Sequence, residues 1–358
     1  MTIQQQHPVE VRPAPDDLVV LRPEGLYCPQ GDFHIDPWRP VERAVITHAH
    51  ADHARGGHRH YLCAEQAREV MRVRLGAVSL QTLAWAESLP LGAVQVSFHP
   101  AGHVLGSAQL RIAFGGRVWV VTGDYKLAPD PTCQAFEPVP CDVLVTESTF
   151  GLPVYRWEAP ERVFANILDW WQECARERRP CVLFAYSLGK AQRLIAGLSA
   201  AAAGVLPGPL AIHPAVEPIN RAYRATGIPI PDCEQWAPAS GRRLEPGTLL
   251  ISPPSASGSA ALGRESDVRL AVASGWMQVR GARRRRGVDR GFVLSDHADW
   301  PALNQAIHAS GAARVIVTHG FESAMVRHLQ EGGRAASSFE TEFGDERDDE
   351  AVRPESGS

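Results

Sequence analysis

Hydrophobic and polar positions follow two different patterns along the chain. Over residues 18–150, short apolar runs punctuated by glycine indicate β-strands and tight turns. Over residues 155–288, a tryptophan-bearing amphipathic stretch, a buried strand and an alanine-rich helix indicate alternating helices and strands. The first pattern returns at about Gly291. We therefore predict an α/β fold in which residues 1–154 and 289–344 form one domain and residues 155–288 an inserted second one, with an active cleft between them.

The insertion and the chain ends have recognisable parts. The amphipathic stretch runs from Glu158 to Arg178, a strand begins at Cys181, and the alanine-rich helix ends near Ala203. At the ends, residues 1–15 are expected to form a loose arm, and the acidic residues 345–358 a disordered tail, because they contain too few apolar side chains to pack.

One short string combines four metal-binding side chains. It reads Val-Ile-Thr-His-Ala-His-Ala-Asp-His-Ala and contains His48, His50, Asp52 and His53. A strand ending at Thr47 would direct His48 and His50 to the same side, while Asp52 and His53 would begin a following helix and face a second ion. Each histidine alone is better explained as an ordinary surface or core residue, but the complete string favours two neighbouring metal ions.

Three further candidate ligands stand at the ends of apolar strands. His103 lies in a glycine-rich loop before the strand at 109–114, Asp124 follows Trp-Val-Val-Thr-Gly, and His319 ends Arg-Val-Ile-Val-Thr. A carboxylate such as Asp124 can bridge two cations, and the glycine before it allows close backbone approach. The two histidines would singly be interpreted as structural, yet this shared placement predicts a site on the rim of a rigid scaffold.

The order of these residues resembles motifs one to four of the metallo-β-lactamase superfamily. Three later residues match motifs of its β-CASP branch, which acts on nucleic acids: Glu147 in Leu-Val-Thr-Glu-Ser, His297 in Leu-Ser-Asp-His-Ala-Asp, and His319 in Val-Thr-His-Gly. Together with Gly-Leu-Tyr-Cys-Pro and Asp-Phe-His-Ile-Asp-Pro-Trp-Arg-Pro, residues 18–346 resemble the bacterial ligase-associated DNA damage response exonucleases.

The resemblance implies a four-layer αββα sandwich carrying a β-CASP insert, and it implies a ligand set. Two divalent ions, Zn²⁺ or Mn²⁺, would share Asp124 as a bridge. One ion would further be held by His48, His50 and His103, and the other by Asp52, His53 and His319. Asp36 would fix a ligating imidazole from behind, although an aspartate before Pro37 equally suits a turn.

Such a pair of cations allows hydrolysis without a side-chain nucleophile. Ions roughly 3.5 to 4 Å apart lower the pKa of a shared water and neutralise charge on a phosphodiester. His297 is the candidate general acid, with Glu147 as the carboxylate that orients it. Alternatively, His297 belongs to a capping segment before Pro301, and Glu147 caps a strand or pairs with an arginine.

A phosphate-binding turn is predicted after the strand at Cys181. Ser187, Gly189 and Lys190 would lie at a helix N-terminus, where unpaired backbone N–H groups attract anions. The alternative is an ordinary serine cap with a solvated Lys190; the resemblance to the β-CASP phosphate-binding turn favours the functional interpretation.

Charge constrains the partner only weakly. The net charge is −4, of which residues 341–358 carry −5, so the rest of the chain carries +1. Nucleic acid would need a local cluster such as Arg280 and Arg283–Arg286, which is equally well a solvated loop. Trp276 and Phe292 beside it are candidates for base stacking, but aromatic residues next to strands more often belong to the core.

Length and cysteine content suggest the cellular setting. The 358 residues include 44% hydrophobic and 21% charged residues, which fits a large globular core. We find no apolar run long enough to cross a membrane and no signal peptide, and seven cysteines without a Cys-x-x-Cys pair indicate free thiols in the cytoplasm.

The predicted function is that of a metal-dependent DNA nuclease, specifically an exonuclease, which hydrolyses phosphodiester bonds with a two-metal-activated water. The resemblance places it in DNA repair beside an ATP-dependent DNA ligase and a helicase. An RNA-processing ribonuclease is the main alternative, because His319 matches the residue usual in RNA-cleaving relatives where several DNA-specific relatives have valine. A small-molecule metallohydrolase and a non-catalytic binding module are weaker alternatives.

Overall fold

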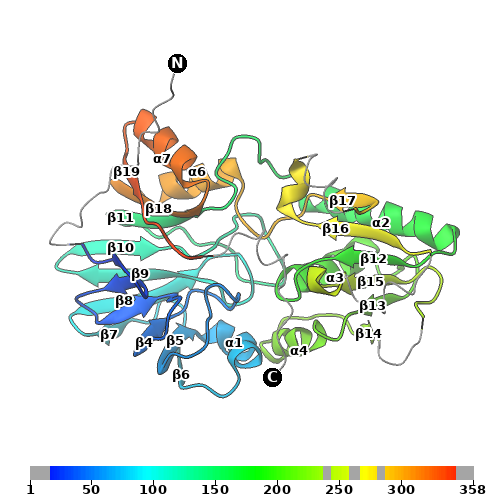
Figure 1. Cartoon of the computed structure of the whole chain (residues 1–358), viewed down its shortest axis with the longest axis horizontal. Helices are drawn as coiled ribbons and strands as arrows, with labels where there is room; N and C mark the ends of the chain where they lie inside the picture. Colours follow the sequence, from blue (N-terminus) through cyan, green and yellow to red (C-terminus); the bar gives the residue numbers. More distant parts are fainter. Residues whose placement is uncertain (1–16, 237–242, 258–266, 280–286, 344–358) are drawn as a thin grey trace.

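The structure is a computed structural model that describes residues 17–236, 243–257, 267–279 and 287–343, and its strands form three sheets (Figure 1). The first sheet has strand order β1-β2-β3-β4-β5-β6. Its strands are β1 (Val20–Arg22), β2 (Gly25–Cys28), β3 (Phe33–Ile35), β4 (Arg43–Val45), β5 (His60–Ala64) and β6 (Leu80–Leu83).

The second sheet has seven strands in the order β19-β18-β11-β10-β9-β8-β7. Strands β10, β11, β18 and β19 are parallel neighbours, so their carboxyl ends share one edge. The strands are β7 (Leu89–Leu91), β8 (Val94–Pro100), β9 (Ala108–Phe114), β10 (Arg117–Val121), β11 (Val143–Ser148), β18 (Arg314–Gly320) and β19 (Ala335–Ser338).

The third sheet is parallel throughout, with order β14-β13-β15-β12-β16-β17. Its strands are β12 (Cys181–Phe184), β13 (Leu210–Ile212), β14 (Glu234–Gln235), β15 (Leu249–Ser252), β16 (Arg269–Ala273) and β17 (Arg290–Phe292). The described α-helices are α1 (Arg68–Leu75), α2 (Pro160–Arg176), α3 (Lys190–Ala201), α4 (Glu217–Ala225), α6 (Trp300–Ala309) and α7 (Glu322–Glu331).

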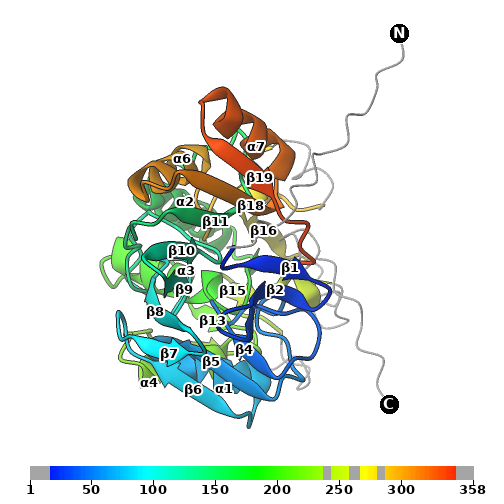
Figure 2. The same ribbon diagram turned by 90° about the vertical axis from the view of Figure 1, so that its left-hand side faces the viewer.

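The first two sheets pack face to face, as the view in Figure 2 shows. Alternate side chains of their strands, such as Ile35, Leu62, Leu110 and Trp119, point into this shared core and are almost fully buried. On the other face of the second sheet, α6 and α7 contribute Leu303, Met325 and their neighbours to a separate core. The two facing sheets therefore form a rigid support for the loops at their edges.

The third sheet lies beside this pair and shares a core with it. Val70 and Met71 of α1 and Tyr61 of the first sheet belong to the same buried cluster as Leu183 and Leu194 around the third sheet. Helices α2, α3 and α4 flank the third sheet in Figure 1. Because buried apolar side chains run continuously from one part to the other, the two parts are held in a defined orientation.

The predicted α/β class and several predicted elements are confirmed. The amphipathic stretch is α2, the alanine-rich helix is α3, and the strand predicted at 109–114 is β9. The third sheet extends past residue 288, since β17 pairs with β16. The domain boundaries themselves stay predictions.

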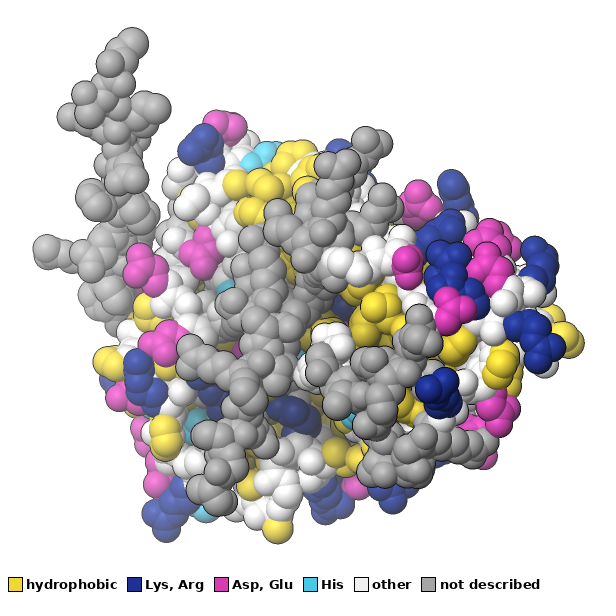
Figure 3. Space-filling model, turned by 45° about the vertical axis from the view of Figure 1, so that its right-hand side comes forward, with side chains coloured by type: hydrophobic (Ala, Val, Ile, Leu, Met, Phe, Trp, Pro, Cys, Tyr) yellow, Lys and Arg dark blue, Asp and Glu magenta, His cyan; other side chains and the backbone are white. Residues whose placement is uncertain are grey.

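Two predicted surface features meet different outcomes. Trp276 and Phe292 are 4% and 5% exposed, so they are core residues rather than stacking platforms. The arginines at 280 and 283–286, the N-terminal arm and the acidic tail lie outside the described residues. On the face seen in Figure 3, Lys and Arg side chains are interspersed with acidic ones. Within the described ranges, every helix is too short or too polar to cross a lipid bilayer.

Candidate metal centre

The predicted ligands meet at one edge of the second sheet. Asp124 follows β10 and His319 lies near the end of β18, while His103 comes from the loop between β8 and β9. The loop after β4 brings His48 and His50 to the same place from the first sheet. Four segments far apart in sequence thus converge, because the parallel strands end at a common edge that the loops after β4 and β8 also reach.

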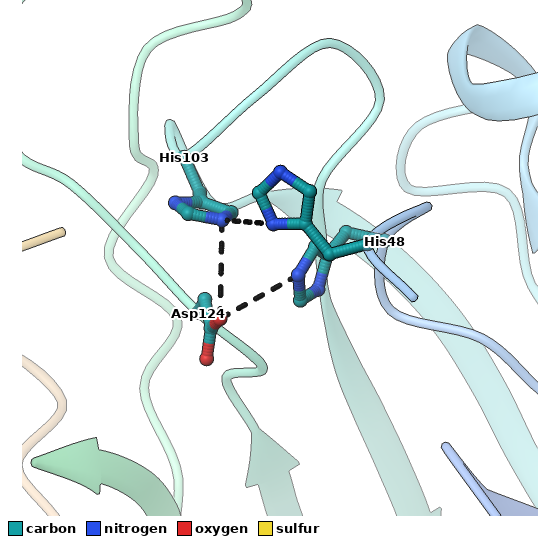
Figure 4. Close-up of side chains that lie close together, drawn as sticks. His48, His103 and Asp124 are labelled. Carbon is teal, nitrogen blue, oxygen red and sulfur yellow. Dashed lines mark hydrogen bonds and ion pairs between the residues drawn. The ribbon is translucent and has the colours of Figure 1, made fainter. Parts of the chain in front are cut away.

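The first group contains His48, His50, His103 and Asp124, whose donor atoms lie within 4.8 Å of one another. Nε2 of His48 is 3.5 Å and Nε2 of His103 is 3.8 Å from Oδ2 of Asp124, and Figure 4 shows both rings directed at this carboxylate. Nε2 of His103 is also 3.0 Å from Nδ1 of His50. The side chains of His48 and His103 are at most 1% exposed, so bulk water does not solvate them.

Hydrogen bonds behind the rings assign the tautomers in this group. Nδ1 of His103 is 2.7 Å from the Asp296 carbonyl, and Nε2 of His50 is 3.2 Å from the Leu188 carbonyl. A carbonyl can only accept, so both of these nitrogens carry hydrogen. Burial lowers the pKa of His50, and burial with the charge of His297 lowers that of His103 well below its usual range. Both imidazoles are therefore neutral, and two nitrogen lone pairs face each other at 3.0 Å.

The second group contains His53, His319 and the same Asp124. Nε2 of His319 is 3.0 Å from Oδ1 of Asp124, and Nε2 of His53 is 3.6 Å from Oδ2. Burial alone would lower the pKa of His53, but the carboxylates of Asp52, Asp124 and Asp36 raise it to about 10. Burial would raise the pKa of Asp124, but the charges of His53 and His319 outweigh burial and hold this pKa well below its usual range. Asp124 is thus an anionic carboxylate shared by both groups.

Asp52 lies at the rim of the second group. Its Oδ2 is 3.5 Å from Nε2 of His53, and its side chain is 13% exposed, more than those of His48, His53 and His319. The structure thus brings His48, His50 and His103 together beside Asp124, and places His53 and His319 in a second group with the same carboxylate, next to Asp52.

Asp36 lies behind the second group and is 1% exposed. Its Oδ2 accepts from Nδ1 of His53 at 2.8 Å, and its two oxygens accept from the amide and the hydroxyl of Thr47 at 2.7 and 2.6 Å. The backbone of Asp36 has φ = 44°, in the left-handed region. This carboxylate therefore orients His53 so that Nε2 faces Asp124, and it also holds the backbone at Thr47.

The helix predicted to begin at Asp52 and His53 is wrong. Residues 51–53 form a turn in which the His53 and Ala54 amides both donate to the His50 carbonyl, and no helix follows before β5. Strand β4 also ends at Val45, two residues before the predicted end, because the Thr47 amide bonds to a carboxylate instead of a neighbouring strand. Two glycines at positions 56 and 57 disfavour helix propagation.

Gly123 is required by the close approach of two loops. Its φ is 54°, and a Cβ atom there would lie 2.6 Å from the hydroxyl oxygen of Thr47. A side chain would force apart the loops that carry His48 and Asp124. The predicted role of a glycine before Asp124 is confirmed in this respect.

His297 and Glu147 form a buried pair beside the first group. Nδ1 of His297 lies 2.9 and 3.1 Å from the two carboxylate oxygens of Glu147, and Oε1 also accepts from the Tyr125 amide at 2.8 Å. The ring of His297 is 4.5 Å from that of His103. The cap of α6 is Asp299, whose side chain accepts from the Ala302 amide, so capping does not account for His297.

The predicted phosphate turn has the expected strand, turn and helix, but its side chains are arranged differently. Lys190 is fully buried rather than solvated, with Nζ 3.8 Å from Oδ2 of Asp296. The Gly189 amide donates to the Gln192 side chain at 2.8 Å. Ser187 faces a cleft of about 440 Å³ whose wall includes His50. Other residues lining this cleft are Ala51, Val73, Arg74, Tyr186, Leu188, Ala215, Pro218, Ile219, Pro253, Pro254 and Ser255.

Residues that sequence reasoning missed also contact the ligands. The ring of Phe343 stacks on His53 with centroids 4.5 Å apart and planes at 8°, and it meets His319 edge-on at 5.5 Å. The backbone beside it is tethered by Arg55, which donates to the Glu342 carbonyl at 3.0 Å. Phe343 follows no strand and lies in no recognised motif, so the sequence offered no signal for it.

The donor set fits divalent cations. Among the described residues, Nε2 of His48 and of His53 are buried without a hydrogen-bond partner, and both face Asp124. Two donors about 2.1 Å from one tetrahedral ion lie about 3.4 Å apart, close to the 3.5 and 3.6 Å separations from Asp124. A cation would also separate the facing lone pairs of His50 and His103. Nitrogen and carboxylate donors without sulfur suit Zn²⁺ and Mn²⁺ alike.

Replacing Asp36 with asparagine is expected to weaken metal binding roughly 10- to 100-fold, because an uncharged amide holds the Nδ1–H of His53 less firmly. Isothermal titration with Mn²⁺ measures this affinity. Asp32→Asn is the matched control, since the Asp32 carboxylate is 73% exposed and pairs with Arg43. Equal affinities for the wild type and Asp36→Asn would contradict the assigned role.

Comparison with known proteins adds four findings. The chain is 32% identical over 320 residues to a "Probable DNA ligase" of Opitutus terrae, a match that covers 87% of this chain and 30% of that protein. It is 31% identical over 119 residues to the cleavage and polyadenylation specificity factor 73 of Drosophila melanogaster, covering 32% of this chain and 17% of that protein. It is 29% identical over 120 residues to the endoribonuclease YSH1 of Yarrowia lipolytica, covering 32% and 14%.

The fourth finding is a solved structure, a protein of unknown function from Enterococcus faecalis. It superposes with a TM-score of 0.56 at 11% identity, covering 84% of this chain and 80% of that chain, and therefore shows a similar fold. No protein-family model matches the chain. The chain spans less than a third of the length of these curated relatives. The sequence similarities support the resemblance to the metallo-β-lactamase superfamily, and the donor clusters support divalent metal binding.

Proposed function

We propose that this chain is a metal-dependent nuclease that hydrolyses phosphodiester bonds, with DNA as its substrate and cleavage from strand ends. The observation that carries the proposal is the pair of buried donor groups that share the anionic Asp124. Imidazole nitrogens gathered around one carboxylate without hydrogen-bond partners of their own are costly to bury unless a cation satisfies them.

One ion would be held by His48, His50 and His103 with Asp124, and the other by His53, His319, Asp52 and the same carboxylate. When bound, two divalent ions supply an activated water and neutralise charge on the phosphoryl oxygens. The remaining tasks, which are to position the substrate and to manage protons, fall to the chain itself.

His297 is proposed to protonate the leaving oxygen. Because Glu147 accepts from Nδ1 of His297, the orientation of the ring is fixed and Nε2 is left to face the substrate. The cleft beside His50 gives a phosphodiester access to the donors, and Ser187 on its wall is positioned to bind a neighbouring phosphate. Gly189 and Lys190, which have partners within the protein, would support this turn from behind.

The DNA substrate is proposed from the long similarity to a protein named a probable DNA ligase. Cleavage from ends, a role in DNA repair beside a DNA ligase and a helicase, and a cytoplasmic location follow from the resemblance to ligase-associated exonucleases. The similarity to a protein named an endoribonuclease, together with His319, favours RNA as the second candidate substrate. In this proposal the two facing sheets correspond to the αββα core and the third sheet, at about 155–288, to the β-CASP insert.

The test incubates the purified protein with 5′- and 3′-labelled single- and double-stranded DNA and matched RNA, adding Zn²⁺ or Mn²⁺ after removal of metals with a chelator. We expect cleavage of DNA that starts at an end, disappears with the chelator and returns with metal. Preference for RNA would select the ribonuclease. Turnover of nitrocefin or a thioester without nuclease activity would select a small-molecule hydrolase, and binding without turnover would refute catalysis.

A further inference from the structure

Five charged side chains are buried together behind the metal centre. Each is at most 5% exposed, although burial of an unpaired charge costs several kcal/mol. Three are cations and two are carboxylates: Lys126, Lys190, Arg193, Asp130 and Asp296. These residues come from three separate segments of the sequence, and only the folded chain brings them together.

Arg193 of α3 contacts both carboxylates of this cluster and the backbone of the segment 295–297. Its Nη1 donates to the Ser295 carbonyl at 2.6 Å and to Oδ1 of Asp296 at 3.0 Å, and its Nε lies 3.3 Å from Oδ2 of Asp130. Lys126 reaches the same two carboxylates, with its Nζ 2.6 Å from Asp130 and 3.8 Å from Asp296, and it lies 3.5 Å from the His103 carbonyl. A planar guanidinium can reach three acceptors in fixed directions, which an ammonium on a flexible stem cannot.

Asp296 connects this cluster to the site. Its backbone carbonyl accepts from Nδ1 of His103 at 2.7 Å, the contact that leaves Nε2 of His103 as a lone-pair donor. The next residue is His297, which pairs with Glu147. Any shift of the segment 295–297 would therefore move the partner of one candidate ligand and the candidate acid at the same time.

We propose that Arg193 is a positioning residue that holds the segment 295–297, and through it His103 and His297, in the geometry needed for metal binding and proton transfer. The contact runs from α3, beside the third sheet, to Ser295 and Asp296 in the segment between β17 and α6, which reaches His103 of the second sheet. Arg193 thus couples the placement of the third sheet to the completeness of the metal centre. The part concerning His297 rests on the proposed nuclease function, whereas the part concerning His103 can be tested by metal binding alone.

The charge balance favours variants that still fold. Without the guanidinium, two lysines and two carboxylates remain in the cluster, so no net charge is left buried. Arg193→Gln removes both the positive charge and the planar set of guanidinium N–H donors. Arg193→Lys keeps the charge and removes only the planar set of donors. Arg179→Gln is the matched control, because Arg179 precedes β12 at the opposite end of the third sheet and pairs there with Asp267.

Three quantities are measured on the full chain: the melting temperature, the number and affinity of Mn²⁺ ions bound, and kcat and KM for the substrate that the wild type cleaves. We expect both Arg193 variants to bind one of the two Mn²⁺ ions with an affinity roughly 10- to 100-fold lower, the range for residues that orient a ligand. We also expect them to lower kcat, with KM changed less than about twofold. Arg179→Gln should match the wild type in both respects. Should Arg193→Gln fail to fold, Arg193→Lys carries the test.

Two results would overturn the proposal: wild-type Mn²⁺ affinity in both Arg193 variants, or an equal loss in Arg179→Gln. The first would show that Arg193 does not set the geometry of the metal centre, and the second that the loss reflects general destabilisation. A wild type that binds Mn²⁺ but cleaves no nucleic acid would refute the proposed function, while the difference in Mn²⁺ affinity would still decide the role of Arg193.

Discussion

Replacing Asp124 with asparagine is expected to abolish hydrolysis, with kcat/KM falling roughly 10³-fold or more, equivalent to at least about 4 kcal/mol of transition-state stabilisation. The reason is that this carboxylate belongs to both donor groups, and its oxygens lie within 3.0 to 3.8 Å of four imidazoles. An amide of the same shape retains the packing but lacks the negative charge that two cations would share.

The effect is measured with the substrate that the wild type cleaves best, and binding of uncleaved nucleic acid is measured in parallel by fluorescence anisotropy. Binding should stay within about threefold of the wild type, because the cleft beside His50 is lined by other residues. Asp142→Asn is a suitable control: this carboxylate accepts from the Val118 amide before β11, at the other end of the strand from the site. Unchanged cleavage by Asp124→Asn would refute the proposed metal centre.

Replacing His297 with glutamine is expected to lower kcat about 10²- to 10⁴-fold on a natural phosphodiester, the usual contribution of general acid catalysis. The deoxyribose oxygen is a poor leaving group and needs a proton. A p-nitrophenyl phosphodiester departs as p-nitrophenolate without protonation, so on that substrate His297→Gln should lose less than about tenfold.

This dependence on the leaving group separates the two variants. Asp124→Asn should lose activity on both substrates, because the metal centre serves both, while His297→Gln should lose it on one. His60→Gln is the control, since its ring is half exposed and bonds to Ser79. Equal losses for His297→Gln on the two substrates would assign His297 a structural role in place of proton transfer.

Sequence patterns located the candidate ligands because each of them lies in a short local string of residues. Apolar runs ending in single polar residues located Asp124 and His319 at strand ends, and the spacing of His48 and His50 placed both in the same group. The helix predicted to begin at Asp52 and His53 is absent because two neighbouring glycines disfavour helix propagation, and β4 ends early because the Thr47 amide bonds to Asp36.

Lys190 illustrates what such patterns miss. A lysine at a helix N-terminus is usually solvated, and only the packing of α3 against the segment 295–297 explains its complete burial beside Asp296. The same holds for Phe343. It stacks on His53 because the segment that follows β19 returns across the site.

By itself, then, the sequence determined the α/β class, the identity and order of the candidate ligands, and the pairing of side-chain types that suits divalent metals. The tertiary structure decided which nitrogen of each imidazole faces Asp124, which charges are buried behind the site, and which helix supports His103. Local patterns reflect interactions between near neighbours, which side-chain type and periodicity specify. The bond from His103 to Asp296 joins residues 193 positions apart, so its existence depends on how whole sheets pack rather than on any string of residues.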